Sequence, residues 1–505
     1  MLNWPLKAGG ICGCIVLFAA LPFAWKEDRR RAKLRRNGRR LRGSRLLTTR
    51  EFNSRFGGDG IGWINEVYIG FWRKKAPLLR IPRKDESHHF LNCGSTGTGK
   101  TVVQTEYIWQ CDQRNECVMV YDPDGYFLSR FYRHGRGDVI INPLDMRGVY
   151  WNPGDEVRDF AEALVVATAF FPDVPGSSMP SAEYFHGGAR KVLARLLCYH
   201  PTPEELTHWM SAPEEIERRL AQTPEAQIMS EAPGQRAGIL GALANGANSF
   251  ALLTTSHEAA ERNLPHWNSH QCAANPKGWI FLTSKTDRLS AIRPIASAIF
   301  DLCILRLLSR SSEARIPVSC VLDELASLNY LPQLHLALTQ ARRFNLKMVV
   351  GFQDKGQLEA RYGREATTLI GMPKTKIYLR TGDASAARWA SENLGDIEVE
   401  RISESSTHGR HNGSTETLQR TTERLVLPSE IQSLPDRHGY LQYEGCVVPI
   451  SFPFRDLPII APAFIERKLP DEQHPNESNS GDKNLPPDGS GPAPKLEQGG
   501  MPFFS

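Results

Sequence analysis

The stretch GSTGTGKT, residues 94–101, constrains the fold of this 505-residue chain more than any other feature. It matches the eight-residue P-loop pattern throughout and lies between an apolar run, HFLNC, and a helix-like run, VVQTEYIWQ. The glycines let backbone N–H groups curl round a phosphate, and the N-terminus of the following helix adds partial positive charge. A Gly- and Thr-rich turn with a chance lysine is the alternative, but the flanking strand and helix argue against it. The motif predicts an α/β nucleotide-binding domain.

Each residue type in this loop has an expected part in binding ATP and Mg²⁺. Lys100 is expected to reach the β- and γ-phosphates, and the Thr101 hydroxyl is expected to hold the metal ion. The other members of the loop are expected to surround the phosphates, and they are Gly94, Ser95, Thr96, Gly97, Thr98 and Gly99.

An acidic pair follows a second apolar run, VSCVLDE, residues 318–324. Asp323 is expected to act on Mg²⁺, directly or through a water, and Glu324 to polarise the attacking water as general base. The alternative is an N-terminal acidic cluster for a helix over LASLNYL. Simple phosphate-binding switches often lack the second acid, so the pair favours an ATP hydrolase.

Two further polar residues end apolar runs. Gln353 follows LKMVVGF and is expected to act as a sensor of the γ-phosphate, with a cap for the next element as the alternative. The stretch YDPDG, residues 121–125, is interpreted as a turn in which Asp122 could face the site.

Seven short apolar runs alternate with helical stretches, which predicts βαβ units and a mostly parallel sheet. They are HHFLNC, CVMVYD, DVIINP, GWIFLT, PVSCVLDE, LKMVVGF and KTKIYL. This rhythm stops between residues 155 and 272, where helical spacing dominates and Thr202 with Glu205 forms a capping-box pattern. The sequence therefore predicts a nucleotide-binding domain in two parts, 51–154 and 273–460, with an all-α domain inserted at 155–272.

The N-terminus predicts a membrane anchor within residues 1–25, because AGGICGCIVLFAALPFAW is about long enough to span a bilayer. A cleavable signal peptide is the alternative, but only Lys7 precedes the apolar run. The basic flank at 26–50 predicts that the bulk of the chain faces the cytoplasm. Attraction to anionic lipid explains this flank more simply than a DNA-binding arm does.

The remaining composition adds little chemistry. The last 45 residues, 461–505, are interpreted as a disordered tail, because Pro, Gly, Ser and Asn dominate most of them. The ten cysteines are scattered without metal-binding spacing, which favours free thiols in a reducing compartment.

Four stretches together resemble the type IV secretion coupling proteins of bacterial conjugation, the TraD-like ATPases. They are CGSTGTGKT, DVIINPLDMRGVYWNP, CVLDELASLNYLPQLHLALTQARRFNLKMVVGFQ and LVLPSEIQSLP. The resemblance implies a RecA-like P-loop motor domain with an inserted all-α domain, assembled as a hexameric homo-oligomer in the bacterial inner membrane. It also implies ATP-driven movement of single-stranded DNA, with its attached relaxase, toward the channel proteins of a type IV secretion system.

By position, the resemblance assigns the family's nucleotide and catalytic roles to Lys100, Thr101, Asp323 and Glu324, and its sensor role to Gln353. Arg342 matches the arginine that the family supplies in trans to a neighbouring active site. Locally, Arg342 and Arg343 are equivalent, since cations are favoured at helix C-termini in general. The family commonly has two membrane spans, whereas this sequence contains one convincing span.

Two other functions fit the same residues. One is a P-loop secretion ATPase that moves protein cargo or duplex DNA, and it requires the same catalytic groups. The other is a non-catalytic membrane docking platform, against which the intact pair of Asp323 and Glu324 argues.

Overall fold

The computed structural model describes residues 29, 38–69, 72–75, 78–173, 180–274, 278–310, 316–407 and 413–469. Residues up to Arg467 form one compact unit and residues from Lys468 onward form a second. The predicted anchor at 1–25 lies outside the described residues, as does the tail beyond residue 469. Within the described ranges, no helix has both the length and the apolar character needed to cross a bilayer.

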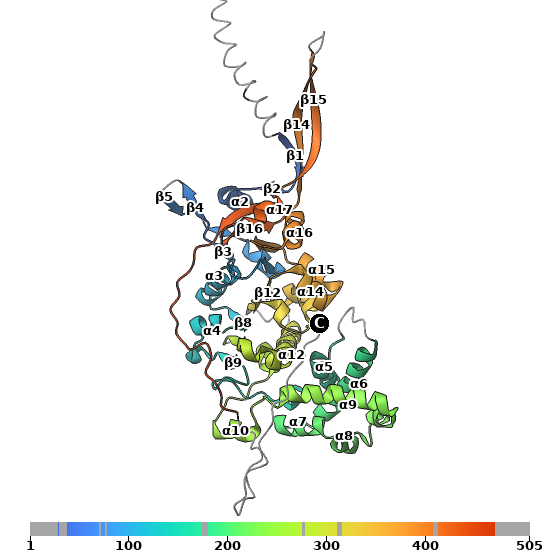
Figure 1. Cartoon of the computed structure of the whole chain (residues 1–505). Coiled ribbons are helices and arrows are strands. Elements are labelled where there is room, and N and C mark those ends of the chain that lie inside the picture. The colour runs from blue at the N-terminus through green and yellow to red at the C-terminus, as the bar shows by residue number, and fades with distance from the viewer. Residues whose placement is uncertain are drawn as a thin grey trace, which may run out of the picture. The chain divides into compact units, whose positions relative to one another are not determined.

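A ten-stranded sheet organises the chain (Figure 1). Seven consecutive strands are mutually parallel and lie in the order β13 (Thr375–Leu379), β7 (Phe90–Cys93), β12 (Leu346–Phe352), β11 (Val318–Leu322), β8 (Cys117–Asp122), β10 (Ile280–Thr283) and β9 (Val139–Ile141), with β9 at one edge of the sheet. Beyond β13 the sheet is extended by β16 (His438–Tyr443), β17 (Cys446–Ser451) and β2 (Arg45–Leu46). Each predicted apolar run contains one of these seven parallel strands, so the α/β class with a mostly parallel sheet is confirmed.

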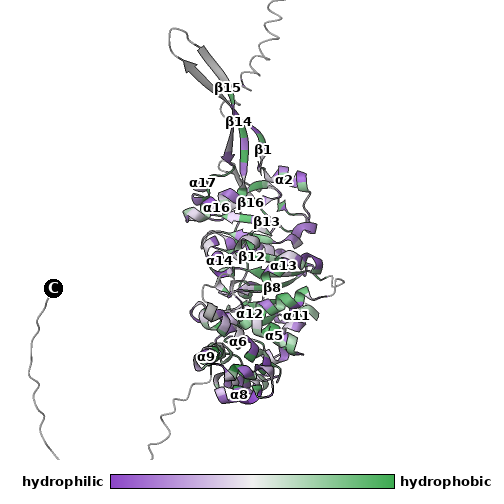
Figure 2. Cartoon of the chain, turned by 90° about the vertical axis from the view of Figure 1, so that its right-hand side faces the viewer, coloured by the Kyte–Doolittle hydropathy of each residue, from purple (hydrophilic) through white to green (hydrophobic). Residues whose placement is uncertain are grey.

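Both faces of the sheet are covered, which explains why its strands are continuously apolar. In β8, Val118 and Val120 belong to a core with α3 (Lys100–Gln113), whereas Met119 and Tyr121 belong to a core with α12 (Leu289–Leu308). Helix α12 is largely hydrophobic along its length (Figure 2). Other helices of the sheet domain are α4 (Tyr126–Phe131), α13 (Leu334–Gln340), α14 (Lys355–Tyr362), α15 (Glu365–Gly371), α16 (Ala384–Leu394) and α17 (Pro428–Gln432).

Between β9 and β10 the described chain is helical. The helices are α5 (Phe160–Phe170), α6 (Pro180–Leu197), α7 (Pro203–Ser211), α8 (Pro213–Leu220), α9 (Pro233–Phe250), α10 (Ser256–Glu261) and α11 (Ser269–Ala274). Helix α7 begins where its sequence predicts. The Thr202 hydroxyl accepts from the Glu205 backbone N–H, and the Glu205 carboxylate accepts from the Thr202 backbone N–H. Leu193 and Leu243 of this insertion share a hydrophobic core with Leu322 of β11. The insertion and one face of the sheet are therefore packed as a single core.

The basic flank predicted at 26–50 is partly folded, which its composition did not indicate. Strand β1 (Arg39–Gly43) pairs with β14 (Asp396–Thr407), and β14 pairs with β15 (Gly413–Arg424). Arg39 lies opposite Glu400, and Arg42 forms an ion pair with Glu398. Cross-strand charge pairs of this kind stabilise a strand that has no apolar face. The acidic partner is hundreds of residues away in sequence, so local patterns could not show this pairing.

Smaller elements precede β7 in the chain and contact β17 and α3. Helix α2 (Thr49–Phe56) precedes two hairpin-like pairs: β3 (Gly62–Trp63) with β6 (Leu79–Arg80), and β4 (Glu66–Ile69) with β5 (Trp72–Lys75).

The chain after β17 remains attached to the body beyond residue 461, where the sequence predicted a tail to begin. The backbone N–H groups of Ile460 and Ala461 donate to the Ser129 carbonyl at 2.8 and 3.1 Å. Arg467 is 4% exposed, donates to the Pro143 carbonyl at 2.6 Å and pairs with Glu258 at 2.6 Å. Arg467 is thus one of several contacts that hold the chain up to residue 467 on the body.

A buried charge cluster lies at the amino edge of the sheet. Lys347 of β12 is 4% exposed, and its Nζ lies 2.6 Å from Glu86 and 2.8 Å from Glu116. Arg114, at the end of α3, donates to Glu86 at 2.8 Å. Buried charges of this kind are costly unless each one is compensated.

We expect Lys347→Met to lower the free energy of unfolding by about 3–5 kcal/mol, because two buried carboxylates lose their shared cation. Chemical denaturation of the purified chain measures the change. The matched control is Lys355→Met, which removes an exposed pair with Glu359 and should change stability by about 0.5 kcal/mol or less. Equal effects of the two substitutions would contradict a stabilising role for the buried cluster.

Candidate nucleotide-binding and catalytic site

The P-loop joins the carboxyl end of β7 to the start of α3. Gly97 and Gly99 have φ angles of 76° and 118°, in the left-handed region that favours glycine. Lys100 begins α3, and its Nζ donates to the Gly94 carbonyl at 2.7 Å. The Lys100 side chain is 9% exposed, so its charge lies in a largely enclosed position. Local sequence is sufficient to build this turn, because glycine is needed at both strained positions.

Two loops hold the back of the P-loop in place. The Arg380 carbonyl, just after β13, accepts from the Ser95 N–H at 3.0 Å, and the Ser95 hydroxyl accepts from the Gly382 N–H at 3.3 Å. The Arg437 N–H, just before β16, donates to the Thr98 carbonyl at 2.8 Å. Sequence reasoning missed these supports. The turn composition of LPDRHG was the available signal, but only the antiparallel pairing of β13 with β16 brings this turn to the P-loop.

The acidic pair reaches the P-loop from β11, which is separated from β7 by β12. Glu324 Oε2 lies 3.8 Å from Lys100 Nζ, and the Glu324 side chain is 17% exposed. Gly351 of β12 permits this close arrangement, because a Cβ there would lie 2.2 Å from the Asp323 carbonyl. The structure therefore brings together the lysine and the two carboxylates that the sequence predicted as one site.

Burial dominates the electrostatics of these groups. Burial and the adjacent Glu324 raise the pKa of Asp323 to about 6, although Lys100 and a hydrogen bond from Thr101 act in the opposite direction. Burial also raises the pKa of Glu324, against the effects of Lys100 and Gln353, and it lowers the pKa of Lys100. Burial therefore penalises the charged form of all three groups, and the proximity of Lys100 to the two carboxyls offsets part of that penalty.

The donor set fits Mg²⁺. Oδ1 of Asp323 and Oε1 of Glu324 are buried and have no hydrogen-bond partner among the described residues. The Thr101 hydroxyl lies within hydrogen-bonding reach of Asp323. Carboxylate and hydroxyl oxygens are suitable ligands for this hard cation, which commonly also binds the phosphates of a nucleotide. Thr101 and Asp323 are therefore the residues best placed to hold it.

Gln353 lies between the P-loop and the acidic pair. The Thr96 hydroxyl donates to Gln353 Oε1 at 2.9 Å. Hydrogen bonding from Gln353 also counteracts the rise in the pKa of Glu324. One side chain at the end of β12 thus contacts both parts of the site, as a sensor must. The capping role in α14 belongs instead to Asp354, whose side chain accepts from the Gly356 N–H.

Asp122 is the last residue of β8, directly before the turn, and its oxygens are used locally. They accept from the N–H groups of Tyr126 and Leu128 at 3.0 and 2.9 Å. Burial raises the pKa of Asp122 to about 7. Both oxygens stabilise the start of α4, so a direct part in the nucleotide site is not supported.

Arg342 and Arg343 lie apart from the P-loop of their own chain. They are exposed in a 3₁₀ turn (Ala341–Phe344) that precedes β12, whereas Gln353 follows β12. Seven strand residues separate the two ends, a distance of about 20 Å. Burial and the Arg342 charge lower the pKa of His88, which precedes β7 at the same amino edge. Within one chain, Arg342 therefore cannot complete this site.

In metal-free protein, Asp323 should make stability fall as the pH rises. The unfolded carboxyl ionises near 3.8 and the folded one near 6, so stability is greatest below the lower value and declines up to the higher one. The loss should approach roughly 3 kcal/mol for a shift of this size. Denaturation in a chelator, from acidic to neutral pH, measures it. Asp323→Asn should remove this part of the pH dependence of the free energy of unfolding. An unchanged pH profile in that variant would contradict the assignment of the effect to Asp323.

Comparison with known proteins shows the family to which this chain belongs. Residues 73–453 match the sequence profile of the family described as type IV secretion-system coupling protein DNA-binding domain. The coupling protein TraD of Escherichia coli (strain K12) is 27% identical over 406 residues, which cover 77% of this chain and 56% of TraD. The chain thus spans little more than half the length of that relative.

Solved structures show the same fold. The unbound bacterial conjugative coupling protein TrwBdeltaN70 superposes with a TM-score of 0.72 and 26% identity, covering 85% of this chain and 97% of that one. The plasmid coupling protein TrwB in complex with ADP and Mg²⁺ gives a TM-score of 0.71 and 25% identity over the same shares. With the profile match extending over most of the sequence, the chain belongs to the family of type IV secretion-system coupling proteins.

Proposed function

We propose that this chain is an ATP-driven motor that moves single-stranded DNA, with its bound relaxase, to a type IV secretion channel during conjugation. One observation carries the proposal: Lys100, Asp323 and Glu324 meet at the carboxyl edge of the sheet, in a chain of the coupling protein family. A P-loop that only stabilised a docking platform would not need a buried second acid. The similar TrwB structure with ADP and Mg²⁺ supports ATP and Mg²⁺ as the ligands of this site.

The residues of the site divide the work of hydrolysis. Lys100 neutralises charge on the β- and γ-phosphates, while the P-loop backbone holds them through N–H groups. Thr101 and Asp323 hold Mg²⁺, which, when bound, offsets phosphate charge during transfer. Glu324 accepts a proton from the attacking water, a step that its raised pKa favours. Gln353 contacts both the P-loop and Glu324, so it is placed to respond when the γ-phosphate leaves.

Completion of the site requires a second copy of the chain. Arg342 is exposed at the amino edge, about 20 Å from its own Gln353, and is free to reach a neighbouring subunit. We assign it to the neighbour's ATP, where an arginine in trans stabilises charge in the transition state. Arg343 keeps the role of an exposed cation at the helix end. A closed ring, a hexamer as in the resembling family, would supply one Arg342 to every site.

The membrane and partner assignments rest on sequence. The apolar run at 8–25 anchors the chain in the bacterial inner membrane, and the bulk of the protein faces the cytoplasm. The all-α domain at 155–272 lies at the cytoplasmic entrance of the ring. The partners are the single strand, the relaxase and the inner-membrane proteins of the channel. Transport of duplex DNA or protein cargo would use the same catalytic residues. Only an assay that compares these cargoes with single-stranded DNA distinguishes the alternatives.

Single-stranded DNA should stimulate ATP hydrolysis by the purified full-length protein more than duplex DNA or protein does. Lys100→Ala should lose hydrolysis because it lacks the phosphate-binding cation, whereas Glu324→Gln should lose turnover by a factor of about 10² or more and still bind ATP. Phosphate release and binding of a fluorescent ATP analogue measure the two properties.

Stimulation only by duplex DNA or by protein would replace the proposed cargo. Undiminished hydrolysis in Lys100→Ala or Glu324→Gln would refute the catalytic assignments. The conjugation frequency of the mobile element that encodes the Lys100→Ala variant, compared with wild type, then shows whether hydrolysis is needed for transfer. Full transfer by that variant would support the docking-platform alternative.

Arg342→Ala should bind ATP normally and lose turnover by a factor of about 10³, because each site lacks the cation from its neighbour. Mixing Arg342→Ala with Lys100→Ala subunits should restore part of the activity, since interfaces form in which one chain supplies the P-loop and the other the arginine. Arg343→Ala is the matched control and should retain activity. Full-rate hydrolysis by Arg342→Ala would end the assignment.

A further inference from the structure

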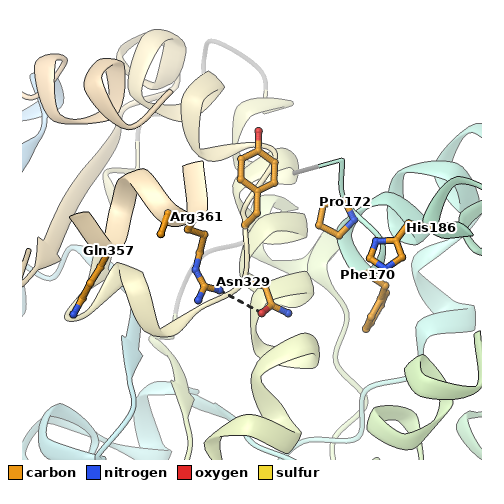
Figure 3. A pocket seen from close by; sticks show the side chains of 8 residues that line it. Phe170, Pro172, His186, Asn329, Gln357 and Arg361 are labelled. Carbon is orange, nitrogen blue, oxygen red and sulfur yellow. Dashed lines mark hydrogen bonds between the residues drawn. The ribbon is translucent and has the colours of Figure 1, made fainter. Parts of the chain in front are cut away.

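A pocket of about 410 Å³ lies between the helical insertion and the sheet domain (Figure 3). Phe170, Pro172 and His186, contributed by α5, α6 and the segment between them, line one side. The other side belongs to the sheet domain and consists of Asn329, Tyr330, Gln357, Ala360 and Arg361. Its volume is within the range of small-ligand sites.

The sheet-domain side of this pocket is directly connected to the catalytic strands. Asn329 and Tyr330 follow Glu324 after one short 3₁₀ turn (Leu325–Ser327). Gln357 and Arg361 lie on α14, which begins two residues after Gln353. A shift of Glu324 or Gln353 when the γ-phosphate leaves would therefore move the wall of the pocket through short, structured connections.

Arg361 is the arginine that lines the pocket, and Arg293 of α12 lies close enough to affect its charge. Arg361 has Asn329 Oδ1 as a distant polar contact, at 3.5 Å, and Arg293 has a buried Nε without a hydrogen-bond partner. In the described parts of the chain, neither guanidinium forms an ion pair with a carboxylate. Burial and the nearby Arg293 lower the pKa of Arg361, as expected for two cations that lack a counter-ion.

The carboxylates near the pocket already have partners. Glu365 accepts from the Tyr330 hydroxyl at 2.9 Å, and Asp173 forms a two-point ion pair with Arg190. Asp173 is neutralised in this way, whereas Glu365 keeps its charge because its partner is a neutral hydroxyl. In the described chain Arg361 has no carboxylate within ion-pair distance, so its charge is available to an external anion. A phosphate or a carboxylate could supply it, and the rest of the lining distinguishes between them.

Aromatic rings provide that distinction. Tyr330 packs against Tyr362, with ring centroids 5.1 Å apart and an interplanar angle of 49°, and this contact fixes its orientation. Phe170 lies on the opposite wall (Figure 3). An aromatic ring beside an arginine that has no ion-pair partner in the described chain matches a nucleotide, whose base stacks while its phosphate is neutralised. An acidic peptide would use the arginines but would not need the rings.

We propose that this pocket binds one nucleotide unit of the transported single strand, with the base against Tyr330 and the phosphate at Arg361. The inference rests on the proposed function, because it names where the DNA contacts the motor. Occupancy is coupled to the ATP site through the 3₁₀ turn after Glu324 and through α14 after Gln353. The strand is thus held at the junction that hydrolysis moves.

Fluorescence anisotropy of a fluorescein-labelled oligothymidylate, titrated with the full-length protein over a salt series, tests this assignment. Arg361→Gln should weaken binding roughly tenfold at low salt and reduce the salt slope by about 0.7, the value for one phosphate contact on a single strand. Tyr330→Leu should weaken binding about 5- to 100-fold with an unchanged salt slope, because it removes stacking and no charge. Tyr330→Phe keeps the ring and should bind like wild type.

Arg364→Ala is the matched control, since it removes an exposed arginine that does not line the pocket, and it should leave affinity and salt slope unchanged. Equal effects of Arg361→Gln and Arg364→Ala on DNA affinity, in variants with wild-type thermal unfolding midpoints, would overturn the proposed role of the pocket. The proposed DNA-transfer function would stand. Wild-type protein that binds no oligothymidylate would overturn the function itself. Displacement of the probe by an acidic peptide, with no effect of Tyr330→Leu, would show a peptide site instead.

Discussion

The enclosed contact between Lys100 and the pair of Asp323 and Glu324 is the interaction on which the rest of this structure depends. Burial penalises all three charges, so the arrangement is tolerable only if they stay together or meet phosphate and a metal ion. That requirement in turn depends on strand order, because β12 must lie between β7 and β11 to place the lysine beside the acids. Gly351 allows the necessary approach, and the loops that contain Arg380 and Arg437 support the P-loop from behind.

Strand β12 connects the two polar edges of the sheet. Its second residue, Lys347, is fixed by buried carboxylates at the amino edge, and Gln353 contacts the P-loop at the other end. Arg342 precedes the same strand and faces outward. A buried strand therefore lies between Gln353, the proposed sensor of a chain's own nucleotide, and Arg342, which we assign to the nucleotide of the neighbour. In a ring, this geometry would transmit the state of one site toward the next without a flexible linker.

The helical insertion is not attached as a separate body, since it shares a hydrophobic core with one face of the sheet. Arg467 adds a polar attachment by joining the segment after β17 to Glu258 of α10. The pocket with Arg361 lies between the helical insertion and the sheet domain. Its two sheet-domain segments begin just after Glu324 and just after Gln353. The lining of this pocket and the catalytic groups are thus close in the chain, as the proposed motor would require.

The sequence by itself determined the seven parallel strands, the P-loop and the acidic strand end, because each is encoded by neighbouring residues: continuous apolar runs, strained glycines and a carboxylate after a strand. It also singled out Gln353. It did not show β1 pairing with β14, the two loops behind the P-loop, the attachment of Arg467 or the pocket at Arg361. The roles of Asp122 and Asp354 were likewise unclear until their hydrogen bonds were known. Each of these features depends on contacts between residues far apart in the chain. The local sequence around each residue does not reveal its partner. Only the tertiary structure decided them, because strand order and packing determine which buried charges find a partner and which are left for a ligand.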